Sequence, residues 1–175
     1  MCNILKYYLL IHLFFCMENS LSIGDPAPDF KINNQDGKEF CLGSISNKWL
    51  IVYFYPKDNT SGCTKEAKEF TELMPQFESF GAKIIGISPD SEKSHIKFIN
   101  KHDLTIELLS DHNHEVAKKY DVWKLKKFMG REYMGIVRST FLINLSKSIS
   151  FIWFNVKVKN HGEIVLEKLQ ELSVK

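Results

Sequence analysis

Hydrophobic positions along the chain fall into short apolar runs separated by amphipathic segments. Runs rich in β-branched, leucine and aromatic residues predict buried strands, whereas apolar residues recurring three and four positions apart predict helices. The expected strands are Leu50–Tyr55, Lys83–Ser88, Thr105–Leu109, Val137–Ile143 and Ile149–Val156. The expected helices are Thr64–Phe80, Ser91–His102, His114–Tyr120 and His161–Leu172. Strands that alternate with helices and finish in a hairpin and a helix predict an α/β sandwich with a mixed sheet.

Turn-forming residues refine this pattern. The Asp36-Gly37 pair lies between two short strand-like pieces and predicts a β-hairpin near the N-terminus. Ser91 directly before the acidic Glu92 is typical of a helix N-cap. Pro75 falls inside the first expected helix, which it is expected to kink or split.

A single domain is expected over residues 21–175, because this part has no repeat, linker or low-complexity tract. Residues 1–20 form a separate N-terminal extension. Its apolar run LLIHLFFC resembles the core of a signal peptide and is too short to cross a membrane as a helix. The alternative is an upstream start, with translation beginning at Met17. We expect a cytoplasmic protein without stable membrane insertion, or an exported or organellar one if residues 1–20 are a targeting segment.

Composition and charge exclude several classes of protein. Hydrophobic residues make up 44% and charged residues 25%, as in ordinary globular proteins. The net charge of +2 is too small for a nucleic-acid footprint, so no nucleic-acid partner is expected, and the basic cluster Trp123–Arg131 is interpreted as a solvated loop. The four cysteines at positions 2, 16, 41 and 63 lack zinc-ligand spacing, so no metal is expected. Their wide separation favours a reducing compartment.

Cys63 stands between the turn formers PKDNTSG and the first expected helix. A thiol at a helix N-terminus faces unpaired backbone N–H groups and the positive end of the helix dipole, which favour the thiolate. Cys63 could instead be a buried, inert apolar residue. Its small and polar neighbours favour an exposed, reactive thiol.

The residues around Cys63 resemble a known motif. PKDNTSGC places Pro56, Thr60 and Cys63 in the pattern Pro-x-x-x-Thr-x-x-Cys, which resembles the active-site motif of the peroxiredoxins. The segments GDPAPDF, IIGIS, LLSD, VWKLKKFMG and GIVRSTFLI extend the similarity over about Leu21–Leu172, and together they look like the bacterioferritin comigratory protein (PrxQ) branch. The resemblance implies a thioredoxin-like fold, with a central mixed β-sheet flanked by helices and an N-terminal β-hairpin.

The same resemblance implies a thiol-dependent peroxidase of antioxidant defence that needs no cofactor. Cys63 would attack hydrogen peroxide or an alkyl hydroperoxide and become a sulfenic acid. Thr60 would hydrogen-bond the peroxide, and Pro56 would shield the site from water. Arg138 would stabilise the thiolate and the developing charge, because a guanidinium offers several donors from a rigid plane.

Two further residues would support this site. The backbone N–H of Gly62 is a plausible additional donor. Glu66 lies three residues after Cys63 on the same helical face, so it could orient Arg138.

Members of this branch often carry a second, resolving cysteine, and both usual positions are empty here. They hold Lys68 and Ala117. At about 100° per residue, Lys68 would face roughly 140° away from Cys63 on an intact helix. Cys41 is a weak resolving candidate and is more simply a buried strand cysteine. We therefore expect a one-cysteine mechanism, reset by thioredoxin or by glutathione with glutaredoxin, in a monomer or weak dimer.

Two rival functions remain open. A thiol–disulfide oxidoreductase could use the same fold, although the missing CxxC motif disfavours it. A redox-sensing or chaperone-like binding protein could keep the fold and turn over poorly.

Overall fold

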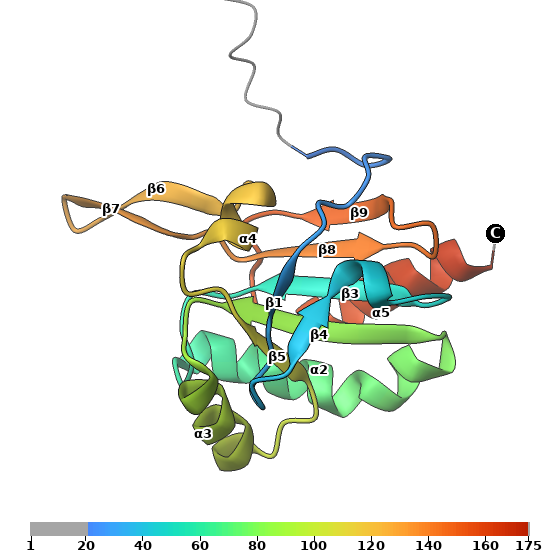
Figure 1. The fold of residues 1–175 in the computed structure, drawn as a ribbon, viewed down its shortest axis with the longest axis horizontal. Coiled ribbons are helices and arrows are strands. Elements are labelled where there is room, and N and C mark those ends of the chain that lie inside the picture. The colour runs from blue at the N-terminus through green and yellow to red at the C-terminus, as the bar shows by residue number, and fades with distance from the viewer. Residues whose placement is uncertain (1–20, 175) are drawn as a thin grey trace, which may run out of the picture.

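The computed structural model describes residues 21–174, so the predicted N-terminal extension, with Cys2 and Cys16, lies outside the described residues. The strands are β1 (Lys31–Asn33), β2 (Glu39–Cys41), β3 (Trp49–Phe54), β4 (Ala82–Ser88), β5 (Glu107–Ser110), β6 (Trp123–Phe128), β7 (Arg131–Ile136), β8 (Ser139–Ile143) and β9 (Ile149–Trp153) (Figure 1). The helices are α2 (Ser61–Ser79), α3 (Glu92–His102), α4 (Glu115–Lys119) and α5 (His161–Ser173), with a 3-10 turn η1 (Leu42–Ser44). None of the helices within residues 21–174 is long and apolar enough to cross a membrane.

Five strands form the central sheet in the order β5-β4-β3-β8-β9. β3, β4 and β5 run parallel, whereas β8 pairs antiparallel with both β3 and β9. The predicted mixed sheet is therefore confirmed. The predicted N-terminal hairpin is also present, because β1 pairs antiparallel with β2 and Gly37 takes a positive φ of 73° in the turn between them.

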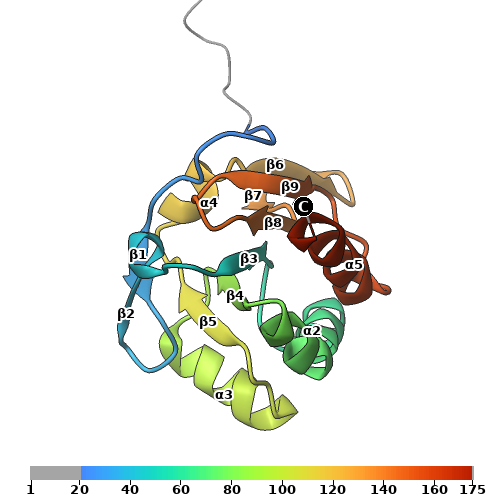
Figure 2. The same cartoon turned by 90° about the vertical axis from the view of Figure 1, so that its right-hand side faces the viewer.

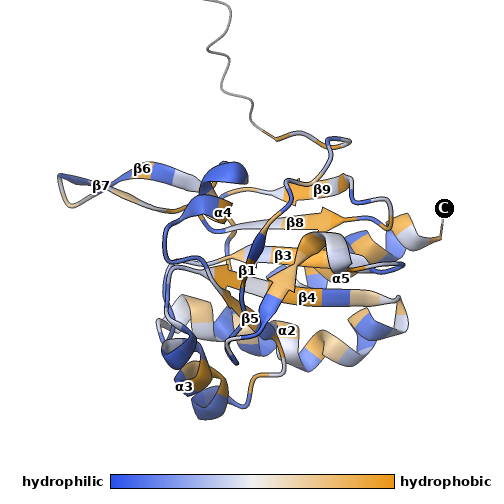
Figure 3. Cartoon of the chain, in the orientation of Figure 1, coloured by the Kyte–Doolittle hydropathy of each residue, from blue (hydrophilic) through white to orange (hydrophobic). Residues whose placement is uncertain are grey.

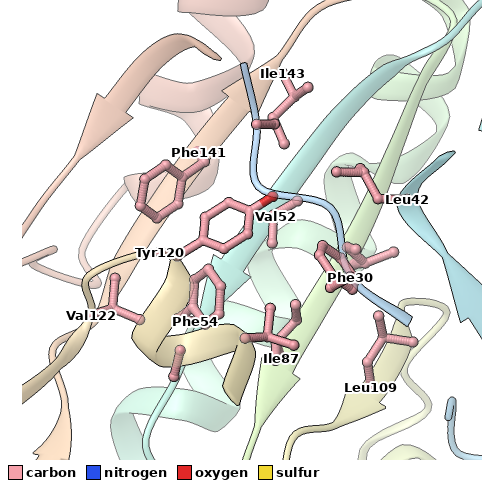
Figure 4. Close-up of a cluster of buried hydrophobic side chains, with 14 of the residues drawn as sticks. Phe30, Leu42, Val52, Phe54, Ile87, Leu109, Tyr120, Val122, Phe141 and Ile143 are labelled. Atoms are coloured by element: carbon pink, nitrogen blue, oxygen red, sulfur yellow. The ribbon is translucent and has the colours of Figure 1, made fainter. Parts of the chain in front are cut away.

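Side chains alternate across the central strands and so build two separate cores. Along β3, Leu50, Val52 and Phe54 enter one core, whereas Ile51 and Tyr53 enter the other. Helices α2, α3 and α5 contribute to the Ile51 side, and α4 with the β1–β2 hairpin covers the Leu50 side (Figure 2). Figure 4 shows the Leu50-side core, where aromatic rings pack around Phe54. Because parallel strands in this sheet are covered on both faces, their apolar runs are nearly continuous, as Figure 3 shows.

The segment Trp123–Arg131 is not the solvated loop that the sequence predicted. It forms β6 and the start of β7, an antiparallel hairpin that extends away from the body of the fold (Figure 1). Its two turn residues, Met129 and Gly130, both take positive φ values, 49° and 78°. Such a two-residue turn matches the twist of a hairpin. The sequence pattern hid these strands because most side chains near the turn face solvent on both sides.

The prediction that Pro75 could split the first helix is wrong. α2 runs as one helix from Ser61 to Ser79 with Pro75 inside it. Pro75 is exposed, whereas Phe70 and Phe77 on either side of it are fully buried. Tertiary packing of these two rings offsets the backbone hydrogen bond that the proline removes.

Candidate active site

The loop that leads from β3 into α2 brings Cys63 to a helix N-terminus. α2 begins at Ser61, with Thr60 as its N-cap in extended conformation, rather than at Thr64 as predicted. The first hydrogen bond of the helix runs from the Thr64 N–H to the Thr60 carbonyl, 2.9 Å. The N–H groups of Ser61, Gly62 and Cys63 therefore precede the regular helical ladder, and they are suited to stabilise negative charge on the Cys63 sulfur.

The Cys63 side chain is buried, with 1% of its surface exposed, so the prediction of an exposed thiol is wrong. Its neighbours Ser61 and Lys65 do face solvent. The first turn of the helix points the sulfur in the opposite direction, into the core that also contains Tyr53 and Tyr55. The polar flanks that suggested exposure belong to the outer side of the same turn.

Arg138 contacts the Cys63 thiol directly. Its Nη2 donates to Cys63 Sγ at 3.0 Å, and its Nη1 donates to the Glu66 carboxylate. The sequence predicted Arg138 inside a strand, but it lies in the short connection between β7 and β8. The sheet register explains the contact: Phe54 at the end of β3 pairs with Ser139, so the residue before Ser139 falls beside the loop leading to Cys63.

Burial dominates the electrostatics of this cluster. Glu66 is fully buried, and desolvation raises the pKa of its carboxyl group to about 7, against the opposing effect of Arg138. Although burial disfavours the charged guanidinium, Glu66 and Cys63 hold the pKa of Arg138 above its usual value. Arg138 thus stays cationic while bridging a carboxyl group and a thiol.

A second buried titratable group lies on the same side of the sheet. His161, at the start of α5, places its Nε2 2.8 Å from the Thr140 hydroxyl. Burial, and then the positive charge of Arg138, lower the pKa of His161 to about 4. This histidine is therefore neutral at physiological pH and leaves Arg138 as the cation at the thiol.

Pro56 and Thr60 lie on the solvent-facing side of the loop. Both are exposed, and the Thr60 hydroxyl donates to the Lys57 carbonyl at 3.1 Å. A pocket of about 280 Å³ opens beside this loop, lined by Pro56, Arg138, Lys126, Ile136, Val137, Asn155 and Val156. The pocket offers apolar and cationic contacts next to the guanidinium that holds the thiol.

The backbone approaches Arg138 closely at Gly62. A Cβ at Gly62 would lie 3.6 Å from Arg138 Nη2 and 3.8 Å from a Val158 methyl group. These are ordinary contact distances, so a small side chain would fill the space beside the guanidinium without a clash. The described residues hold no cluster of three or more potential metal ligands.

The positions considered for a resolving cysteine lie on other sides of the fold than the Cys63 thiol. Lys68 is exposed while Cys63 is buried, as the helix rotation predicts. Ala117 is buried in the core on the opposite face of the central sheet. Cys41 is a free, half-buried cysteine, and its neighbours Phe40 and Leu42 belong to that opposite core as well.

The sequence analysis missed two polar residues near the site. Asp58, inside the loop, and His95, on α3, are both buried and their side chains lie 3.0 Å apart. No periodicity marks Asp58, because a polar residue between turn formers is normally solvated. Only the burial of the loop against α3 reveals the pair.

Comparison with known proteins agrees with this geometry. The AhpC/TSA family matches residues 23–152. Peroxiredoxin Bcp of Bacillus subtilis is 45% identical over 156 residues, 89% of this chain and 99% of that protein. Peroxiredoxin Bcp of Escherichia coli is 38% identical over 153 residues, 87% of this chain and 98% of that protein.

Solved structures show the same relationship. A mutant of Xylella fastidiosa PrxQ superimposes with a TM-score of 0.83 at 39% identity, covering 87% of this chain and 98% of that one. The bacterioferritin comigratory protein of Xanthomonas campestris, whose alkyl peroxide reduction activity is described, gives a TM-score of 0.79 at 38% identity over 82% and 92% of the two chains. The sequence motif, the thioredoxin-like fold and these relatives lead to one conclusion: this chain belongs to the AhpC/TSA family and is a peroxiredoxin of the Bcp branch.

Proposed function

We propose that this peroxiredoxin, a thiol-dependent peroxidase, works by a one-cysteine mechanism centred on Cys63. The observation that carries the proposal is the contact between Arg138 Nη2 and Cys63 Sγ, 3.0 Å, at the N-terminus of α2. A guanidinium and a helix N-terminus both stabilise a thiolate, which is the nucleophilic form of cysteine. No other described cysteine has such surroundings, because Cys41 lies at the end of β2.

In the peroxide step, the Cys63 thiolate attacks one oxygen of the peroxide and the O–O bond breaks. Cys63 becomes a sulfenic acid, and the other oxygen leaves with the bonding electrons and takes a proton, giving water or an alcohol. The Thr60 hydroxyl, now bonded to the Lys57 carbonyl, can turn to the peroxide. Arg138 and the N–H groups at the helix start then stabilise charge on the leaving oxygen.

The substrate class is hydrogen peroxide and alkyl hydroperoxides. The pocket beside Pro56 and Arg138 is lined partly by Ile136, Val137 and Val156, which suits the carbon chain of an organic hydroperoxide. The alkyl peroxide reduction activity described for the Xanthomonas campestris relative supports this assignment.

The reset step uses an external thiol. A reductant thiol attacks the Cys63 sulfenic acid and releases water, and a second thiol cleaves the mixed disulfide. Because Cys63 is 1% exposed, this step requires the first turn of α2 to open locally. Thioredoxin, or glutathione with glutaredoxin, would serve as reductant, and a reducing, cytoplasmic compartment and a monomer or weak dimer fit this scheme.

Two serine variants test the mechanism. Cys63→Ser should abolish peroxide consumption in the presence of excess thiol, whereas Cys41→Ser should retain it. Loss of turnover in Cys41→Ser would overturn the one-cysteine mechanism. A single stoichiometric oxidation of wild-type protein, without turnover, would favour the redox-sensing or chaperone-like alternative, and reduction of insulin disulfides would favour the oxidoreductase.

A further inference from the structure

Asp58 anchors the loop that carries Pro56 and Thr60. Within the described loop from Pro56 to Thr60, Asp58 alone is buried, with 5% of its surface exposed. The two residues of the peroxiredoxin motif in this loop are each two positions away from it, and both face solvent. Their placement beside Cys63 therefore depends on how firmly Asp58 is held.

Three side chains converge on the Asp58 carboxyl group. Oδ1 accepts a hydrogen bond from the Tyr55 hydroxyl at 2.8 Å. Oδ2 accepts one from the Ser94 hydroxyl at 2.7 Å and lies 3.0 Å from His95 Nδ1. Tyr55 directly follows β3, whereas Ser94 and His95 belong to α3. The carboxyl group thus fastens the loop to a helix far away in the sequence.

Both ring nitrogens of His95 have partners. Nε2 lies 3.3 Å from the Leu109 carbonyl. Nδ1 lies 3.0 Å from Asp58 Oδ2 and 3.4 Å from the Tyr55 hydroxyl. The ring is therefore held between the loop and β5, whichever nitrogen carries the hydrogen.

Further contacts fix the loop backbone against the same side of the fold. The Asp58 N–H donates to an Asp90 carboxylate oxygen at 2.8 Å, and that oxygen also accepts from the Ser88 hydroxyl at 2.9 Å. At the other end of α3, His102 Nε2 lies 3.2 Å from the Asn59 side-chain oxygen. The segment after β4 and both ends of α3 thus hold Asp58 and Asn59.

We propose that Asp58 and His95 form a buried positioning pair that keeps the loop Tyr55–Thr60 in the conformation required for oxidation of Cys63. The inference rests on the proposed peroxidase function and adds two positioning residues to it. Their side chains hydrogen-bond to the loop, α3 and β5 rather than to Cys63, so they act through the backbone that carries Pro56 and Thr60. The same pair closes the loop over the start of α2, where the reset step requires opening.

This role predicts opposite effects on two reactions of the same sulfur. Releasing the loop should slow oxidation by peroxide, which requires Thr60 and Arg138 in place. It should speed alkylation of Cys63 by iodoacetamide, which requires access to the buried sulfur. A change that only weakened binding of an organic substrate would leave the alkylation rate unaltered.

The experiment compares Asp58→Ala with Asp58→Asn in single-turnover oxidation by hydrogen peroxide. Misplacement of a reacting group by about 1 Å can cost roughly 100-fold, so Asp58→Ala should lose at least about tenfold in the second-order rate constant. Its alkylation rate should rise severalfold. Asp58→Asn should remain within about threefold of wild type, because the amide oxygen can accept from Tyr55 and the amide N–H can donate to His95 Nδ1.

Two more variants keep the test decisive. Leu42→Ala removes a buried side chain from the opposite face of the sheet, and it should lower the melting temperature without changing the oxidation rate of folded protein. Ser94→Ala removes one donor to Asp58, and its oxidation rate constant should fall by less than that of Asp58→Ala. If Asp58→Ala does not fold, the loss in Ser94→Ala relative to wild type still tests the proposal.

Wild-type rates of oxidation in Asp58→Ala, or in Ser94→Ala where Asp58→Ala does not fold, would overturn the proposal. An equal loss in Leu42→Ala would also overturn it, by showing that lost stability alone explains the effect. Failure of the wild-type protein to oxidise at Cys63 is a separate result, which would refute the proposed function instead.

Discussion

Replacement of Arg138 by lysine isolates the contribution of its fork-shaped guanidinium to the peroxide step. One nitrogen of Arg138 reaches Cys63 Sγ at 3.0 Å while another reaches the Glu66 carboxylate. A lysine ammonium keeps the positive charge but is a single point on a flexible chain. It cannot hold the thiol and the carboxyl group in the same geometry, so Arg138→Lys tests geometry and not charge alone.

The magnitude follows from the lost hydrogen bond. A hydrogen bond to a charged group contributes about 1.5–3 kcal/mol. If that stabilisation acts on the attacking sulfur in the transition state, its loss lowers the rate constant by roughly 10- to 100-fold. We expect the rate constant of Arg138→Met to fall by the larger of these factors and that of Arg138→Lys to fall at least about tenfold.

Stopped-flow measurement of Cys63 oxidation under single-turnover conditions gives the rate constant without the reset step. Arg138→Met also removes the cation that opposes the effect of burial on Glu66, and removing one partner of a buried pair can cost about 3–5 kcal/mol of folding stability. The double variant Glu66→Gln with Arg138→Met removes the orphaned carboxyl group. It should recover stability in a urea titration but not the oxidation rate. An Arg138→Lys rate within about threefold of wild type would refute the fork-geometry argument.

Three further outcomes follow from the structure. Folding raises the pKa of Glu66 from 4.5 to about 7, so this group favours the folded state most below pH 4.5, and the contribution, on the order of 3 kcal/mol, is lost as the pH rises through about 7. The difference in unfolding free energy between wild type and Glu66→Gln should therefore change over this pH range, and a constant difference would contradict the buried-carboxyl assignment. Gly86→Ala should destabilise the fold by about 1–3 kcal/mol in urea, because the new Cβ would lie 2.6 Å from the Tyr53 ring, and unchanged stability would contradict this packing. Slow reset should leave the sulfenic acid open to a second peroxide, so intact-mass measurement at rising peroxide should show sulfinic acid, whereas a rapid intramolecular disulfide would count against the one-cysteine scheme.

Local patterns in the sequence were sufficient for the order and type of most elements. The apolar runs gave β3, β4 and β8 to within a few residues, because strands covered on both faces need nearly continuous apolar side chains. Asp36-Gly37 marked the first hairpin, and the turn formers before Cys63 marked the start of a helix. These signals are local, since they depend on backbone preferences and on side chains a few positions apart.

The hairpin formed by β6 and β7 escaped prediction for the opposite reason. It stands apart from the core, so few of its side chains are buried, and lysine residues separate its few apolar positions in β6. Its stability depends on cross-strand pairing and on the positive φ values at Met129 and Gly130. Neither property leaves a hydrophobic pattern in the sequence.

The sequence by itself determined that Cys63 lies at a helix start, together with the loop of turn formers before it. Only the tertiary structure decided that Cys63 is buried, that Arg138 contacts it and that Asp58 pairs with His95. The physical reason is strand pairing: β8 beside β3 brings Arg138 to the loop, and β4 on the other side of β3 brings α3 to it. Both contacts join residues far apart in the chain, so they follow from the order of strands in the sheet rather than from any local pattern.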